Sequence, residues 1–95
     1  MNQPIQQPID GLLDLHTFRP DEVKDLVPDY LLACRERGIL RVRIIHGKGT
    51  GTLKRLVLSL LEKQSYIESI RPAGEEEGGW GATVVDLRKE EDARS

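Results

Sequence analysis

The chain contains two histidines, His16 and His46, and each follows a short apolar run. His16 closes the stretch LDLH, in which Asp14 precedes it by two positions, and His46 opens the stretch HGKGTG, in which Lys48 follows by two. An imidazole can take or give a proton near neutral pH, a carboxylate can orient that imidazole, and a lysine can neutralise an anion. These residue types predict proton-transfer chemistry on an anionic substrate, with Asp14, His16 and His46 as the candidate catalytic residues.

The glycine-rich loop after His46 has the features of an anion-binding site. Glycine permits positive φ and close approach of a ligand, and the first N–H groups of the helix expected near Thr52 point outward with the positive end of the helix dipole. The loop matches neither the triphosphate pattern GxxxxGK[ST] nor the dinucleotide pattern GxGxxG, which disfavours both kinds of cofactor. The predicted phosphate-binding residues here are Gly47, Lys48, Gly49, Thr50, Gly51, Lys54 and Arg55.

Composition indicates one globular domain. The 95 residues are 38% hydrophobic and 32% charged, enough to bury one modest core. The single Cys34 can form no internal disulfide, and no apolar run approaches about 18 residues, so we expect no membrane span and a cytoplasmic protein.

The distribution of charge is uneven. A net charge of -2 argues on its own against a nucleic-acid binder, yet residues 35–55 hold seven basic side chains and only one acidic one. Arg41 and Arg43 belong to this run and alternate with Val42 and Ile44 on an expected strand. One interpretation is a solvated sheet face; the local excess of charge favours a surface that tracks nucleic-acid phosphates, with Arg41 and Arg43 among its contacts.

Hydrophobic periodicity predicts the element order βαβαββ. The expected strands are 12–16, 39–46, 66–70 and 82–87, and the expected helices are 21–37 and 52–64. This order favours an α/β fold, a two-layer sandwich in which a four-stranded mixed sheet carries two helices. The domain is expected at 12–88, between an extended arm (1–11) and a charged flexible tail (89–95).

The element order also positions the histidines. In open α/β sheets the carboxyl ends of parallel strands meet at one edge, where ligands bind. His16 ends the first expected strand and His46 ends the second, so both should lie at this edge. Leu13 and Leu15 alternate with Asp14 and His16, which predicts one face for the core and one face for the chemistry.

A third glycine-rich stretch, GGWGAT at 78–83, precedes the last expected strand. Gly79 and Gly81 flank Trp80, the only tryptophan in the chain. The indole could stack on a nucleic-acid base or could cover the core, and the sequence leaves both interpretations open.

Three motifs together resemble the small MutS-related (Smr) domain family: LDLH at 13–16, HGKGTG at 46–51 and GGWGAT at 78–83. The resemblance covers about 12–88 and implies a βαβαββ sandwich with endonuclease or nicking activity, on DNA in some members and on RNA in others. Many members have glycine directly after the first histidine, where this chain has Thr17. The residues assigned to the motifs by resemblance are Asp14 and His16, then His46, Gly47, Lys48 and Gly49, then Gly79 and Gly81.

We therefore expect a small endonuclease with little base specificity, because basic and amide donors contact phosphate rather than base edges. On RNA, one histidine would take the 2′-hydroxyl proton and the other would protonate the departing 5′-oxygen. On DNA, a transient divalent cation would activate water, and no permanent metal site or other cofactor is expected. The alternative is a module that binds nucleic acid or a ribosome without cutting. The sequence leaves the choice of DNA or RNA and the oligomeric state open.

Overall fold

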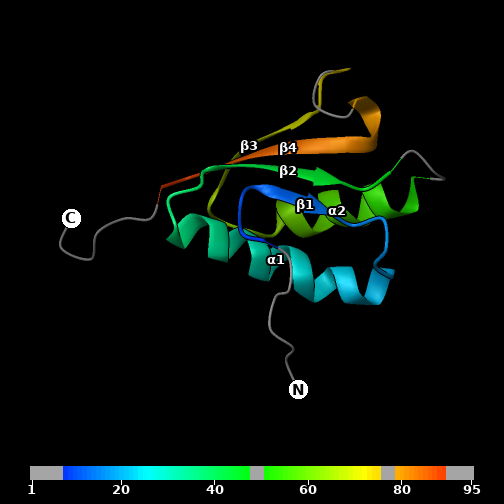
Figure 1. Cartoon of the computed structure of the whole chain (residues 1–95), viewed down its shortest axis with the longest axis horizontal. Coiled ribbons are helices and arrows are strands. Elements are labelled where there is room, and N and C mark those ends of the chain that lie inside the picture. The colour runs from blue at the N-terminus through cyan, green and yellow to red at the C-terminus, as the bar shows by residue number, and fades with distance from the viewer. Residues whose placement is uncertain (1–7, 48–50, 76–78, 90–95) are drawn as a thin grey trace.

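The computed structural model describes residues 8–47, 51–75 and 79–89, and its elements follow the predicted order (Figure 1). Most of the expected arm and tail, 1–11 and 89–95, lies outside the described residues. Neither of the two described α-helices is long and apolar enough to cross a membrane. The elements are β1 (Leu12–Asp14), α1 (Pro20–Glu36), β2 (Arg41–Ile45), α2 (Thr52–Glu62), β3 (Ile67–Pro72), the 3-10 helix η2 (Gly79–Gly81) and β4 (Ala82–Leu87).

The four strands form one mixed sheet in the order β1-β2-β4-β3. β1 is parallel to β2, whereas β4 is antiparallel to both of its neighbours, β2 and β3. β3 therefore runs in the direction of β2, and the returning strand of the hairpin lies between them. The predicted fold class is confirmed: four strands in a mixed sheet and two helices.

Both helices cover the same face of this sheet (Figure 1). Alternation along the strands directs every second side chain toward them, and the apolar stripes of the helices supply the other half of the core. The fully buried core residues are Leu13, Leu15, Val42, Ile44 and Val85 from or beside the strands, and Val23, Val27, Tyr30, Leu31, Cys34, Val57 and Leu61 from the helices.

Local signals set the ends of α1. Pro20 occupies the first helical position, and the Glu22 carboxylate accepts the backbone N–H of Arg19 at 2.8 Å. Gly38, whose φ is 76°, follows the carboxyl end in the left-handed conformation that commonly stops a helix. The helix begins and ends one residue earlier than predicted.

The first strand is shorter than the predicted 12–16. It ends at Asp14 because the chain turns there: the Leu15 carbonyl accepts the N–H of Phe18 at 3.0 Å, and His16 lies in the turn. The other strand and helix bounds differ from the prediction by one or two residues, and β4 matches it.

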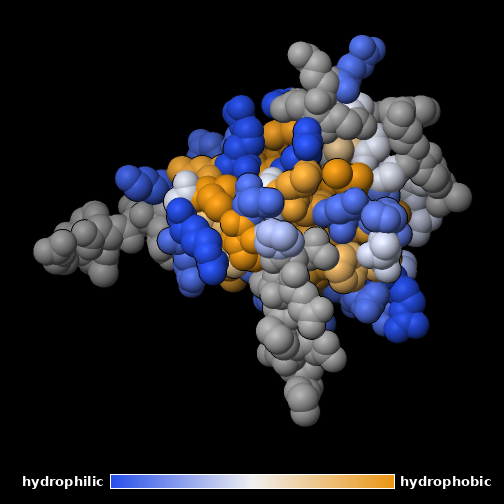
Figure 2. Space-filling view, in the orientation of Figure 1, coloured by the Kyte–Doolittle hydropathy of each residue, from blue (hydrophilic) through white to orange (hydrophobic). Residues whose placement is uncertain are grey.

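The sheet face turned away from the helices carries a second, smaller apolar cluster. It consists of Ala73, Ala82 and Val84, with Ile45 packed against it. Hydrophilic side chains and apolar patches share the surface of the molecule (Figure 2). We call this side of the sheet, which no described helix covers, the open face.

Candidate functional site

Asp14 and His16 form a hydrogen-bonded pair at the carboxyl end of β1. The Oδ1 of Asp14 accepts the backbone N–H of His16 at 3.0 Å and lies 2.7 Å from the Nδ1 of the same residue. The backbone bond and the side-chain bond both hold the pKa of Asp14 below its ordinary value, so the carboxylate is ionised. Because a carboxylate only accepts, Nδ1 carries a proton and Nε2 is the remaining ring nitrogen.

This pair is accessible to a substrate. The side chains of His16 and Asp14 are 68% and 41% exposed, whereas Leu13 and Leu15 on the alternate positions are buried. The predicted alternation of buried and exposed side chains therefore holds from Leu13 to His16. Thr17, in the same turn, is also exposed.

His46 has a different environment. It is only 5% exposed, its Nε2 lies 2.8 Å from the Oγ1 of Thr83, and its Nδ1 lies 3.2 Å from the carbonyl oxygen of Gly47. A carbonyl cannot donate, so Nδ1 holds the ring proton and Nε2 accepts from the Thr83 hydroxyl. Burial lowers the pKa of His46, the Gly47 carbonyl opposes this, and the charge of Lys54 adds to the lowering. His46 is therefore neutral at neutral pH.

The two histidines occupy one edge but not one cluster. The N–H of Leu15 bonds the carbonyl of Ile45 at 2.9 Å, which sets the ends of β1 and β2 side by side. However, His46 follows the alternation of the buried Ile44 and lies on the helix side, whereas Asp14 lies on the open face. Within the described part of the chain, no hydrogen bond joins His16 to His46. Both histidines therefore lie at one edge of the sheet, but the His46 ring is buried on the core side and the His16 ring is exposed.

A pocket of about 260 Å³ lies at the amino end of α2. It brings the buried His46 of the second motif together with the start of α2 and with Phe18 and Pro20, which follow the first motif. Its lining residues are Phe18, Pro20, His46, Gly47, Gly51, Thr52, Leu53 and Lys54.

The helix end that opens into this pocket is suited to an anion. The first helical hydrogen bond of α2 runs from the N–H of Arg55 to the carbonyl of Gly51 at 3.0 Å, so the amides of Leu53 and Lys54 precede the helical ladder. Gly51 caps the helix with φ 89° and provides no side-chain hydrogen bond. The positive end of the helix dipole and the Lys54 ammonium act at the same place.

The third motif, GGWGAT, is hydrogen-bonded to the backbone of His46 and Gly47. The carbonyl of Gly81 accepts the N–H groups of both His46 and Gly47 at 2.9 Å, and the N–H of Gly79 bonds Gly74 at 2.8 Å. Thr83, two residues beyond Gly81, holds the His46 ring. Thr83 was not among the predicted site residues, although it belongs to the stretch GGWGAT.

Several predicted site residues are not described. Lys48, Gly49 and Thr50 lie outside the described residues, as does the side chain of Trp80. Of the other predicted contacts, Lys54 lines the pocket and Arg55 is exposed one residue further along α2.

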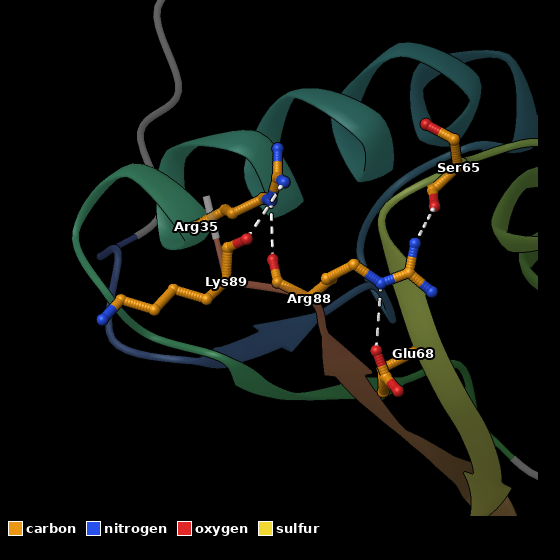
Figure 3. Close-up of polar contacts among 5 residues, drawn as sticks. All are labelled: Arg35, Ser65, Glu68, Arg88 and Lys89. Atoms are coloured by element: carbon orange, nitrogen blue, oxygen red, sulfur yellow. Dashed lines mark hydrogen bonds and ion pairs between the residues drawn. The ribbon is translucent and has the colours of Figure 1, made fainter. Parts of the chain in front are cut away.

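The basic residues of the run 35–55 that the structure describes do not form one surface. Arg41 and Arg43 lie on the open face, whereas Arg35, near the end of α1, donates from Nε to the carbonyl of Arg88 at 2.8 Å (Figure 3). Its guanidinium also lies 5.1 Å from the centre of the Tyr66 ring. Figure 3 shows Arg88 bound in turn to Ser65 and Glu68, so Arg35 serves to hold the end of β4.

In the described ranges, no three His, Cys, Asp or Glu side chains gather in a way that could hold a metal ion. Asp14 and His16 are only two potential ligands, and the Cys34 thiol is buried in the core.

Comparison with known proteins tests the resemblance of the three motifs. The profile of the Smr domain matches residues 13–88. The chain belongs to the Smr domain family. Among Smr proteins, it is 45% identical over 76 residues to Endonuclease MutS2 of Halalkalibacterium halodurans, a match that covers 80% of this chain and 10% of the relative. Endonuclease MutS2 of Halothermothrix orenii is 42% identical with the same coverage. This Smr chain thus spans about a tenth of these relatives.

Two solved Smr structures share the fold. The Smr domain of Thermus thermophilus MutS2 superposes with a TM-score of 0.76 at 36% identity, covering 81% of this chain and 96% of that one. YdaL, a stand-alone small MutS-related protein from Escherichia coli, gives a TM-score of 0.74 at 28% identity, covering 86% of this chain and 67% of that one. The predicted family and fold are therefore confirmed.

Proposed function

We propose that this Smr domain is an endonuclease that cuts phosphodiester bonds of DNA or RNA with little base specificity. The observation that carries the proposal is the exposed Asp14–His16 pair, whose 2.7 Å contact orients the imidazole and leaves Nε2 for proton transfer. The name Endonuclease MutS2 of the matched relatives supports the same reaction class. Because this chain spans about a tenth of those relatives, the activity is proposed for the domain by itself.

His16 is the proton-transfer group of the proposal. On RNA, Nε2 takes the proton of the 2′-hydroxyl as that oxygen attacks phosphorus; the bond from phosphorus to the 5′-oxygen breaks, and the 5′-oxygen takes a proton from solvent. On DNA, which lacks the 2′-hydroxyl, Nε2 takes the proton of a water that attacks phosphorus; one phosphorus–oxygen ester bond breaks, and the departing oxygen takes a proton from solvent. In both reactions the Asp14 carboxylate stabilises the imidazolium that forms.

The pocket beside α2 is the proposed phosphate site. Its lining combines the Lys54 ammonium with the amides at the helix start, both of which suit a phosphate oxygen and neither of which distinguishes bases. Phe18 and Pro20 on its wall follow His16 by two and four residues, so a phosphate held there stays close to the catalytic pair. His46, whose ring nitrogens are both engaged, belongs to the wall of this site rather than to the proton transfer.

The test is single-turnover cleavage of labelled RNA and DNA strands, with and without chelator, and with binding measured on the same variants. His16→Ala should lower the cleavage rate by a factor of about 10² to 10⁴ while the Kd stays within about twofold, because general acid–base help acts on the transition state. Asp14→Asn should also slow cleavage without weakening binding. The chelator arm reports whether cutting of DNA needs a divalent cation.

Asp25→Asn, an exposed carboxylate change on α1, is the matched control and should leave both quantities unchanged. A parent protein that binds nucleic acid but cuts neither polymer would assign the domain to a non-catalytic module that binds nucleic acid or a ribosome. Equal cleavage rates for His16→Ala and the parent would reject the assigned role of His16.

A further inference from the structure

The open face of the sheet has an ordered arrangement of charged and apolar side chains that the pocket and the Asp14–His16 pair do not use. Strand register sets Leu12, Arg43, Val84 and Arg71 in one row across β1, β2, β4 and β3. A second row, toward the other end of β2, holds Arg41, Asp86 and Ser69.

Arg41 and Arg43, two residues apart on β2, differ in their partners. Arg41 is held by an acid: its Nε lies 2.7 Å from the Oδ1 of Asp86, whose Oδ2 accepts from the Ser69 hydroxyl at 2.8 Å. The hydrogen bonds from Arg41 and Ser69 keep the pKa of Asp86 low, with Arg41 the larger cause. The charge of Arg41 is therefore balanced within the protein.

Arg43 has no such partner. Its Nε is buried without a hydrogen-bond acceptor, and no ion pair joins it to an acid in the described ranges. A buried donor without an acceptor is unfavourable, and moving this side chain toward an incoming acceptor breaks no hydrogen bond. Arg43 is thus the arginine on this face that gains most from a phosphate.

Arg71 reaches the same place from a different part of the chain. Arg43 and Arg71 are both register partners of Val84, on the strands at either side of it. Val84 is only 1% exposed although no described helix covers it, as expected where long arginine stems lie along an apolar residue. The two arginines therefore stand about 10 Å apart across an apolar floor.

The row also leads toward the proposed catalytic pair. Asp14 lies two residues beyond Leu12, the register partner of Arg43, so it is a diagonal neighbour of Arg43 at about 8 Å. From β3 to β1 the row spans three strand spacings, about 14 Å. Two arginines and an exposed histidine thus follow one path across the open face.

We propose that the open face guides a nucleic-acid strand, with phosphates on Arg71 and Arg43, toward His16. Charge complementarity identifies the occupant, because guanidinium groups bind phosphate and the apolar floor offers no donors to read base edges. The inference rests on the proposed endonuclease function and names the path of its substrate. It also separates Arg43, which contacts the strand, from Arg41, whose charge Asp86 already balances.

The experiment measures binding of a short fluorescein-labelled strand of 2′-O-methyl RNA, which has no 2′-hydroxyl to attack, by fluorescence anisotropy at several salt concentrations. Arg43→Gln and Arg71→Gln should each raise the Kd by about threefold to tenfold at low salt. Each should also reduce the slope of log K against log salt by about one, because one phosphate contact is lost.

Arg41→Gln is the matched control, because Arg41 lies on the same strand and the same face as Arg43 and the substitution removes the same charge. It should alter the Kd by less than about twofold, because Arg41 already pairs with Asp86. Equal effects at Arg41 and Arg43 would show a general charge effect and overturn the path, as would unchanged binding in both Arg43→Gln and Arg71→Gln. Circular dichroism of each variant verifies that the fold is kept.

Cleavage measured on the same proteins separates this inference from the proposed function. If, at low protein concentration, the cleavage rate depends on His16 but not on Arg43 or Arg71, the proposed path is rejected and the endonuclease function is kept. Binding that depends on Arg43 and Arg71 in a protein that does not cut would support the path while rejecting the endonuclease.

Discussion

At the residue scale, the two histidines differ in exposure and in hydrogen-bond partners. The Asp14 carboxylate orients an exposed imidazole, whereas the Thr83 hydroxyl and the Gly47 carbonyl hold a buried one. An exposed imidazole can exchange protons with a substrate. A buried imidazole with both nitrogens hydrogen-bonded instead holds the neighbouring chain segments together. The difference lies in hydrogen-bond partners and burial, since the residue type is the same.

Removal of the Thr83 hydroxyl should therefore lower the free energy of unfolding, because the buried His46 ring loses its hydrogen-bond donor. Thr83→Val keeps the volume but leaves Nε2 of the buried His46 without a donor, which should lower the free energy of unfolding by about 1–3 kcal/mol. Thr83→Ser keeps the hydroxyl and should cost less. Urea denaturation of the two variants makes the comparison, and a larger loss for Thr83→Ser than for Thr83→Val would show that the methyl group, not the hydrogen bond, matters.

The lowered pKa of His46 predicts a pH dependence of folding. The unfolded chain takes up a proton near the ordinary value of 6.5, while the folded protein resists protonation to a lower pH. Stability from this group is complete above about pH 6.5 and is lost as the pH falls from there to the folded pKa. Thermal unfolding of the parent and of His46→Gln measures the effect, and the variant should lose less stability in this window. The same slope in both proteins would contradict the prediction.

At the element scale, glycines in the left-handed region set the turns that position β1 and β2. Gly11, before β1, has φ 93°, and Gly38, after α1, has φ 76°. A Cβ on Gly11 would lie 3.0 Å from the carbonyl oxygen of Arg41, whereas a Cβ on Gly38 would meet nothing within 4 Å. The first turn is therefore restricted by both backbone conformation and contact, the second by conformation alone.

Alanine substitutions at these two glycines should differ accordingly. Gly38→Ala should cost about 1–2 kcal/mol from the left-handed conformation alone. Gly11→Ala should cost more, because its Cβ presses on the backbone of β2, which cannot move without disturbing the β1–β2 pairing. Denaturant unfolding measures both, and a smaller loss for Gly11→Ala would contradict the contact argument.

At the scale of the whole molecule, Tyr30 connects α1 to the chain that enters the sheet. Its buried hydroxyl lies 2.9 Å from the carbonyl oxygen of Pro8 and 3.1 Å from that of Leu12, and it accepts the N–H of Gly11 at 3.2 Å. One side chain thus satisfies backbone groups about twenty residues away. The end of the expected arm is bound to the domain through this hydroxyl.

Tyr30→Phe tests this connection. The change removes one oxygen and leaves partly buried backbone groups without a partner, so the free energy of unfolding should fall by about 1–3 kcal/mol. Amide hydrogen exchange should increase at Gly11 and Leu12 more than at the β4 residues. Uniform protection in the variant would mean that packing of the ring, not the hydroxyl, holds this segment.

The sequence by itself determined the element order, the family and the strand-end placement of both histidines. Those features depend on local periodicity and on short motifs, which the chain carries in consecutive residues such as LDLH and HGKGTG. Asp14 and His16 could be paired in advance because they are two positions apart, although the structure pairs them through a turn that follows β1 rather than along a strand. The linear run of basic residues could not be resolved, because neighbours in sequence such as Arg35 and Arg41 belong to different elements.

Only the tertiary structure decided which groups meet across the chain. The insertion of β4 between β2 and β3 sets Thr83 against His46 and places Arg71 and Arg43 on either side of Val84, pairs separated by tens of residues. The same packing buries His46 on the helix side, which lowers its pKa and removes it from the exposed pair. Strand order and burial are properties of the packed sheet, since a hydrogen-bond ladder can join any strands with matching registers, and no local pattern specifies its neighbour.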